Sequence, residues 1–213
     1  TDLGRRPSIK RPIASGDINC DGISDLVVSA PKWAPYDPVF NPFLDPLGRT
    51  IILWGGRGNW PAEIKQRELT DFYGTRIHDI DGEGVLGDDV AVIPDTNGDG
   101  TDELFISKAY RHGNADDDLE APYHNPKGNV FKIMGRENWS LDVSIADVTD
   151  EWIHGIHLDT PLGGQLDVSA DFNGDGILDW IFVDEFTSGP TPESYTSSSY
   201  VIYGYHQLYP EVE

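Results

Sequence analysis

Short apolar runs separated by Gly, Pro, Asn and Asp recur along the chain with the spacing of strands. They are rich in β-branched and aromatic residues, which favour a pleated, half-buried surface. The pattern predicts a first group of strands at DVAVI and QLDVSA, a second group at DLVVSA, ELFISKA and DWIFVDE, and a third group at RTIILWG and NVFKIMG. TRIHDI or LDVSIADV is a candidate for a fourth strand that follows them. Only PAEIKQRELTDF (61–72) has apolar spacing compatible with a helix.

The strands belong to three copies of one unit. SGDINCDGISDLVVSAP (15–31), IPDTNGDGTDELFISKA (93–109) and SADFNGDGILDWIFVDE (169–185) align without gaps, and Leu86-Gly87 and Leu162-Gly163 precede the second and third copies at equal spacing. Four short strands at a fixed period predict an all-β chain of β-propeller blades. Blade 1 covers about 1–80, blade 2 about 81–158 and blade 3 about 159–213, whose last strand is missing or supplied elsewhere.

Each copy contains an acidic loop with oxygen-bearing side chains at positions 1, 3, 5 and 9 and glycine at position 6. With the backbone carbonyl of position 7, these oxygens suit a hard cation. They favour Ca²⁺ over Mg²⁺, because Ca²⁺ accepts more ligands in flexible geometry. About three ions are expected. Their predicted ligands are Asp17, Asn19, Asp21, Ile23 and Asp25, then Asp95, Asn97, Asp99, Thr101 and Glu103, then Asp171, Asn173, Asp175, Ile177 and Asp179.

Two positions qualify this interpretation of the loops. An EF-hand needs a bidentate Glu at position 12, where these loops have Val28, Ile106 and Phe182 inside apolar runs. The expected setting is therefore a strand–loop–strand hairpin. In the second loop Asp102 stands beside Glu103, so either acid is a candidate for the position-9 ligand.

The segments LGDDVAVIPDTNGDGTDELFISKA and LGGQLDVSADFNGDGILDWIF resemble FG-GAP repeats, the blades of the integrin α-subunit β-propeller. SAP at 29–31 is similar to the closing element of that repeat. The resemblance implies calcium in the hairpin between strands one and two of each blade, and an extracellular adhesion or ligand-binding role. The resemblance implies a ring that closes with about seven blades, within the four to eight blades typical of propellers. Three blades would therefore belong to a longer propeller, to a ring completed by other chains, or to an open array.

Charge and composition narrow the class of partner. Thirty-seven acidic residues against fifteen basic ones give a net charge of −22, which argues against nucleic acid and anionic membranes as partners. No apolar run is long enough to span a bilayer, so no membrane insertion is expected. The single cysteine, Cys20, excludes an internal disulfide framework.

Antiparallel strands alternate in direction, so the loops between strands two and three are expected at the end opposite the calcium loops. The first of them (31–48) carries four aromatic side chains among prolines. Such side chains suit a protein or glycan ligand, or they pack on the neighbouring blade. The candidate ligand-binding residues are Trp33, Tyr36, Phe40 and Phe43.

No residue pattern indicates catalysis. His154 and His157 lack a third metal ligand, and Asp79, Asp81 and Glu83 are expected to form a turn between blades. The sequence therefore predicts a non-catalytic, calcium-binding module of an extracellular or cell-surface protein, used for adhesion, recognition or assembly. Two alternatives stay open. One is a carbohydrate-binding or polysaccharide-processing protein, and the other is a structural subunit of a surface filament or array.

Overall fold

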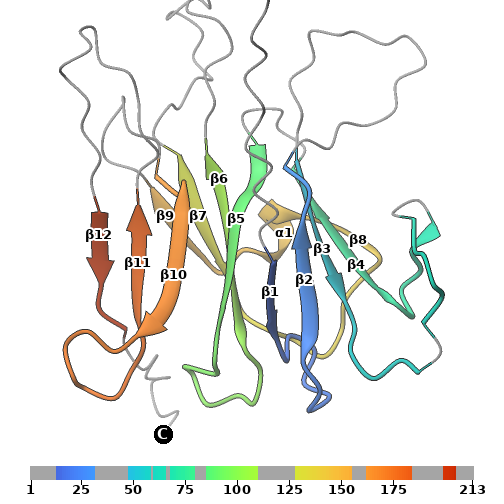
Figure 1. Cartoon of the computed structure of the whole chain (residues 1–213), viewed down its shortest axis with the longest axis horizontal. Coiled ribbons are helices and arrows are strands. Elements are labelled where there is room, and N and C mark those ends of the chain that lie inside the picture. The colour runs from blue at the N-terminus through green and yellow to red at the C-terminus, as the bar shows by residue number, and fades with distance from the viewer. Residues whose placement is uncertain are drawn as a thin grey trace, which may run out of the picture.

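The computed structural model describes residues 13–31, 48–58, 60–65, 68–79, 85–109, 128–154, 162–183 and 199–204. These residues form twelve strands and one short helix, α1 (Ile145–Val148), and no helix among them is long and apolar enough to cross a membrane (Figure 1). The strands are β1 Ile13–Gly16, β2 Asp25–Ser29, β3 Arg49–Leu53, β4 Gly74–His78, β5 Val85–Ile93, β6 Glu103–Ala109, β7 Asn129–Ile133, β8 Asp142–Ser144, β9 Glu151–His154, β10 Gln165–Ala170, β11 Asp179–Val183 and β12 Ser199–Ile202.

The strands form three sheets, one for each copy of the repeat, which confirms the all-β class. The first sheet has the order β1-β2-β3-β4-β8, the second β5-β6-β7-β9 and the third β10-β11-β12. Neighbouring strands are antiparallel, except that β8 runs parallel to β4. None of these sheets closes on itself.

The predicted strands around the acidic loops are confirmed, but two other predictions need correction. TRIHDI forms β4 as expected, whereas LDVSIADV divides into β8 and α1, and β8 joins the first sheet. The fourth strand of the second sheet is β9, which the sequence pattern missed. The described residues of 61–72 contain no α-helix. They end in a turn in which the carbonyl of Thr70 accepts the backbone N–H groups of Tyr73 and Gly74, leading directly into β4.

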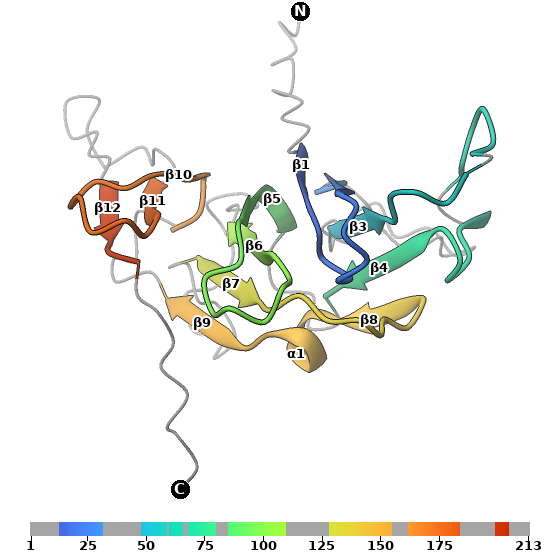
Figure 2. The same ribbon diagram turned by 90° about the horizontal axis from the view of Figure 1, so that it is seen from below.

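The three sheets stand side by side in a fan, with a hydrophobic core at each junction (Figure 2). Strand β6 contributes to both cores because its side chains alternate between the two faces of the middle sheet. Leu104 and Ile106 belong to the cluster shared with the first sheet, and Phe105 belongs to the cluster shared with the third. All three are fully buried.

The Leu-Gly landmark of one repeat packs on the preceding sheet. Leu86 is fully buried, and Gly87 has a φ of 80°, a conformation that favours glycine. Ser29 Oγ, in the SAP element of the first repeat, donates to the carbonyl of Gly87 at 2.5 Å. At the next junction, Gly163 (φ 101°) lies against Ser107 of the SKA element. Motifs that are far apart in sequence therefore meet between successive sheets.

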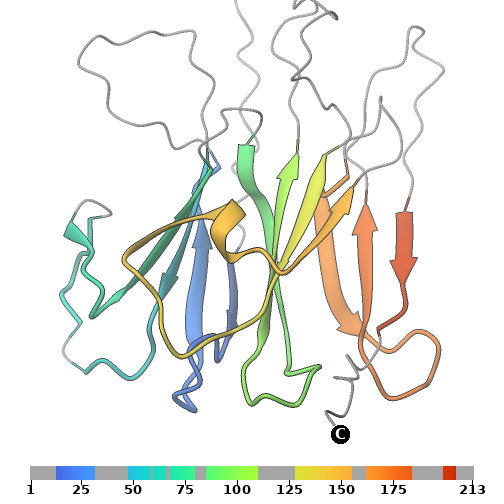
Figure 3. The same ribbon diagram turned by 180° about the vertical axis from the view of Figure 1, so that it is seen from behind.

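The three acidic loops lie together at one end of the sheets (Figures 1 and 3). Strands β2, β6 and β11 run away from that end and terminate at the opposite one. The aromatic candidates Trp33, Tyr36, Phe40 and Phe43 fall outside the described residues.

Candidate metal-binding loops

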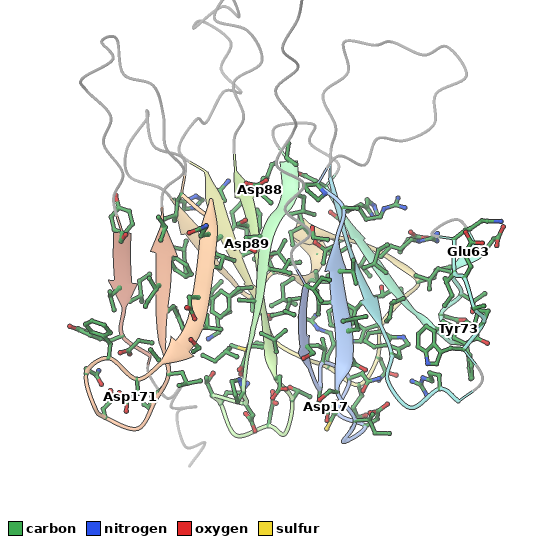
Figure 4. The ribbon with its side chains drawn as sticks, viewed as in Figure 1. Asp17, Glu63, Tyr73, Asp88, Asp89 and Asp171 are labelled. Atoms are coloured by element: carbon green, nitrogen blue, oxygen red, sulfur yellow. The ribbon has the colours of Figure 1, made fainter. Side chains whose placement is uncertain are left out.

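The three candidate loops connect β1 to β2, β5 to β6 and β10 to β11. Their first aspartates are the last residues before each turn, and Asp17 and Asp171 appear at the same end of the molecule in Figure 4. Because each hairpin joins paired antiparallel strands, the strands fix where each loop begins and ends. The sequence repeat thus places three similar acidic loops on one edge.

The aspartate at position 1 accepts backbone N–H groups from the turn that follows it. In the third loop, Asp171 Oδ1 accepts from Gly174 at 2.6 Å and from Asp175 at 3.1 Å, and Oδ2 accepts from Gly176 at 2.8 Å. The second loop repeats these bonds on Asp95. In the first loop, Asp17 accepts from the residues at positions 5 and 6.

Positions 3 and 5 complete the same turn. In the third loop, Asn173 Oδ1 accepts the N–H of Asp175 at 2.9 Å, and Asp175 Oδ1 accepts the N–H of Ile177 at 2.8 Å. The equivalent bonds are present in the other two loops. The position-6 glycine has φ between 78° and 89° in every copy, which lets the chain curl around the first aspartate. The structure therefore brings positions 1, 3 and 5 together in all three loops.

The acid at position 9 is buried beneath each loop. Asp25, Glu103 and Asp179 are no more than 1% exposed. Asp179 Oδ2 accepts the N–H of Phe172 at 2.6 Å, and its Oδ1 accepts the N–H of Gly204 at 2.8 Å, which joins the loop to the end of β12. Asp25 makes the corresponding bonds to Ile18 and Gly55.

The structure separates the two acids of the second loop. Glu103 takes the position-9 place, and both of its oxygens accept the N–H of Thr96. The Asp102 side chain lies instead between the first and second loops. Its carboxylate accepts the N–H of Asp17 at 2.7 Å and that of Asp95 at 3.1 Å. The sequence shows that the second loop has an acid at this position, where the other loops have Ser24 and Leu178. It does not show which N–H groups that acid accepts.

Burial changes the pKa of two position-9 side chains, Asp25 and Glu103. Desolvation raises the pKa of Asp25 to about 6 and that of Glu103 to about 7, although backbone N–H donors act in the opposite direction. For Asp99, desolvation is outweighed by hydrogen bonds from Thr101 and Asn97, which lower its pKa. A nearby divalent cation would favour the ionised form of all three acids.

The chemistry of the donor set fits a hard cation, because every side-chain candidate offers oxygen. Within the described residues, however, no three His, Cys, Asp or Glu side chains converge into a ready metal site. The carboxylates accept N–H bonds from their own loops, and the position-9 acid is turned toward the backbone. The asparagine amide and the position-7 carbonyl are further oxygen donors outside those four residue types.

The other acidic and histidine candidates have different partners. Asp79 Oδ2 lies 2.5 Å from Lys108 Nζ in a buried ion pair between the first and second sheets. His154 Nδ1 lies 2.8 Å from Asn129 Oδ1. His157, Asp81 and Glu83 are outside the described residues.

No protein-family model and no curated protein matches the chain.

Proposed function

We propose that this chain is a calcium-stabilised segment of an FG-GAP-type β-propeller, working outside the cell or at its surface in adhesion, recognition or assembly. The supporting observation is that three loops with oxygen-bearing side chains at the same positions share the bonds from the position-5 and position-6 N–H groups to the position-1 aspartate. These loops stand at one end of three successive sheets whose junctions repeat. Antiparallel sheets stacked side by side are the units of a propeller.

Calcium would serve a structural purpose in this proposal. The oxygens of positions 1, 3, 5 and 9, with the carbonyl of position 7, would hold the ion. Its charge would offset the repulsion among aspartates that the turn crowds together. Because the position-9 acid bonds the end of the third strand in the first and third repeats, an ordered loop stabilises the whole sheet. Metal-binding free energy would then contribute to folding free energy.

Recognition is assigned to the opposite end of the sheets. The calcium loops are alike in every repeat, whereas the loops between the second and third strands differ in length and composition. Loops of varied sequence on a rigid scaffold commonly carry binding specificity. We propose that the partner is a protein or a glycan and that the chain binds it without catalysing a reaction.

Thermal unfolding with and without calcium tests the proposal. Saturating Ca²⁺ is expected to raise the melting temperature above that in chelator. Each independent site contributes about 2.7 kcal/mol of stability at a free Ca²⁺ concentration of 100 times its Kd. Mg²⁺ at the same concentration is expected to have a smaller effect, because it requires a tighter octahedral site. Identical melting curves in calcium and in chelator would overturn the proposal.

A charge-matched pair of variants assigns the effect to the loops. Asp175→Asn removes one carboxylate from position 5 of the third loop. Asp167→Asn removes an exposed carboxylate from β10, outside the loop. We expect the first to lower the number of bound ions measured by calorimetry and the second to leave it unchanged. An equal effect of both variants would show that calcium binding depends on the net charge of the chain and not on the loop.

A further inference from the structure

Each sheet has one face toward the preceding sheet and one toward the following sheet. On β6, Leu104 and Ile106 pack toward the first sheet, while Phe105 packs toward the third. The ungapped alignment of the repeats gives the equivalent residues on β2 and β11, the second strands of the first and third sheets. Residues equivalent to Leu104 and Ile106 form the preceding-side face: Leu26 and Val28 in the first sheet, Trp180 and Phe182 in the third.

The preceding-side face is buried in the second and third sheets but partly exposed in the first. Leu104 is 0% exposed and Trp180 is 2% exposed, whereas the equivalent Leu26 is 41% exposed. On the adjacent inner strand, Val90 opposite Ile106 is 6% exposed, but Ile13 opposite Val28 is 60% exposed. The first sheet therefore presents Leu26 and Ile13 of this face to solvent, while Ile51 on the neighbouring strand is buried.

The following-side face is buried in the first and second sheets but partly exposed in the third. Val27 and Ile52, paired across the first sheet, are both fully buried. In the second sheet, Phe105 is 0% and Lys132 is 1% exposed. The equivalent pair in the third sheet is Ile181 and Val201, and Val201 is 40% exposed. This face, formed by Asp167, Ile181, Val183 and Val201, has the apolar positions of an internal junction.

Charged residues lie among the apolar positions of both faces. Arg49 and Ile51 lie on the preceding-side face of the first sheet, because residues two apart in a strand share a face. Arg76 is paired opposite Ile51 and contacts Asp142. The third sheet has the exposed acid Asp167 opposite Ile181, at a place where the earlier repeats have alanine. The Arg76 side chain is 12% exposed and is paired with Asp142, so the apolar side chains rather than charge carry the match between the two faces.

We propose that the following-side face of the third sheet packs on the preceding-side face of the first sheet in a second copy of this chain. The described part of the molecule leaves one face of each kind partly exposed, and its two internal junctions show that such faces pack together. This contact is head to tail, so it generates a ring if the rotation closes and a filament if it does not. The inference rests on the proposed repeat architecture and not on calcium.

Sedimentation velocity and light scattering on the full chain test this contact. The unmodified chain is expected to show a mass that rises with concentration. Leu26→Asp and Val201→Asp each place a carboxylate in one apolar face, so each variant alone is expected to associate at least about tenfold more weakly. Because each variant keeps the face that the other has lost, an equimolar mixture of the two is expected to form heterodimers.

Phe172→Asp is the matched control, since Phe172 is 68% exposed on the third loop and lies on neither face. It is expected to associate like the unmodified chain, and melting curves of all variants check that they are folded. A monomer at every concentration would overturn the inference, as would variants that associate normally or a mixture that forms no heterodimer. The mass reports the contact, while the calcium shift in melting temperature reports the proposed function, so either can fail alone.

Discussion

The carboxylate of Asp102 joins the first residues of two acidic loops. It accepts the N–H of Asp17 at 2.7 Å and that of Asp95 at 3.1 Å, while its own N–H donates to the carbonyl of Asp17 at 2.8 Å. Asp17 and Asp102 are 85 residues apart and belong to different sheets. Hydrogen bonds therefore connect the first and second acidic loops across the junction of their sheets, as well as within each hairpin.

Replacing Asp102 with alanine is expected to remove a charged acceptor from two N–H groups. We expect a loss of about 2 kcal/mol in the free energy of unfolding, measured by denaturant titration, since hydrogen bonds to charged groups are stronger than neutral ones. Calcium binding to the first and second loops is expected to weaken, with the third loop unaffected. Ser24→Ala, at the equivalent exposed position of the first loop, is the control and should change stability little.

Gly87→Ala is expected to be among the most destabilising substitutions at the sheet junction. An added Cβ would overlap with Ser29 Oγ and lie 2.8 Å from Thr50 Oγ1, and the φ of 80° is unfavourable for alanine. We expect a loss of about 3 kcal/mol or more, because strain and overpacking add. Gly58→Ala isolates the backbone part, since Gly58 has a φ of 72° and open space around it. A loss equal to that of Gly58→Ala would contradict the packing argument.

Local chemistry made the acidic loops predictable from sequence. The turn within each loop is shaped by hydrogen bonds between residues no more than seven apart, such as those of Asp171 with Gly174 and Gly176. The sequence pattern therefore contains nearly all of the information that shapes the turn. The same holds for the strands that flank it, whose β-branched and aromatic runs pair with their immediate neighbours.

Features set by distant contacts were not predictable. Strand β8 joins β4 because Thr75 Oγ1 donates to Ser140 and Arg76 pairs with Asp142, contacts that span about 65 residues of chain. The partner of Asp102 lies in another repeat, so its sequence position suggested only an alternative loop ligand. The position-9 acids likewise looked equivalent to the other ligands, and only the structure shows that they are buried and bonded to backbone.

Cys20→Gly is expected to stabilise the first loop. Cys20 has a φ of 61°, whereas the second and third loops have Gly98 and Gly174 at this position, with φ values near 80°. A side chain in this conformation costs about 1 kcal/mol or more, so its removal should raise the melting temperature by about 2–4 °C. Differential scanning calorimetry under reducing conditions measures the change. Gly174→Ala is expected to shift the melting temperature in the opposite direction, and a rise in both variants would refute the explanation.

The buried ion pair between Asp79 and Lys108 is expected to behave differently from a surface pair. Asp79→Leu would leave the Lys108 ammonium buried without its acid, at a cost of about 3–5 kcal/mol. The double variant Asp79→Leu/Lys108→Met should recover most of that loss, because apolar side chains can replace a buried pair. Glu68→Gln is the control: its pair with Lys65 spans 3.9 Å between side chains about half exposed, so little change is expected. Denaturant titration of the unmodified chain, Asp79→Leu, Lys108→Met and the double variant gives the coupling energy, and additive losses would show that Asp79 and Lys108 stabilise the junction independently.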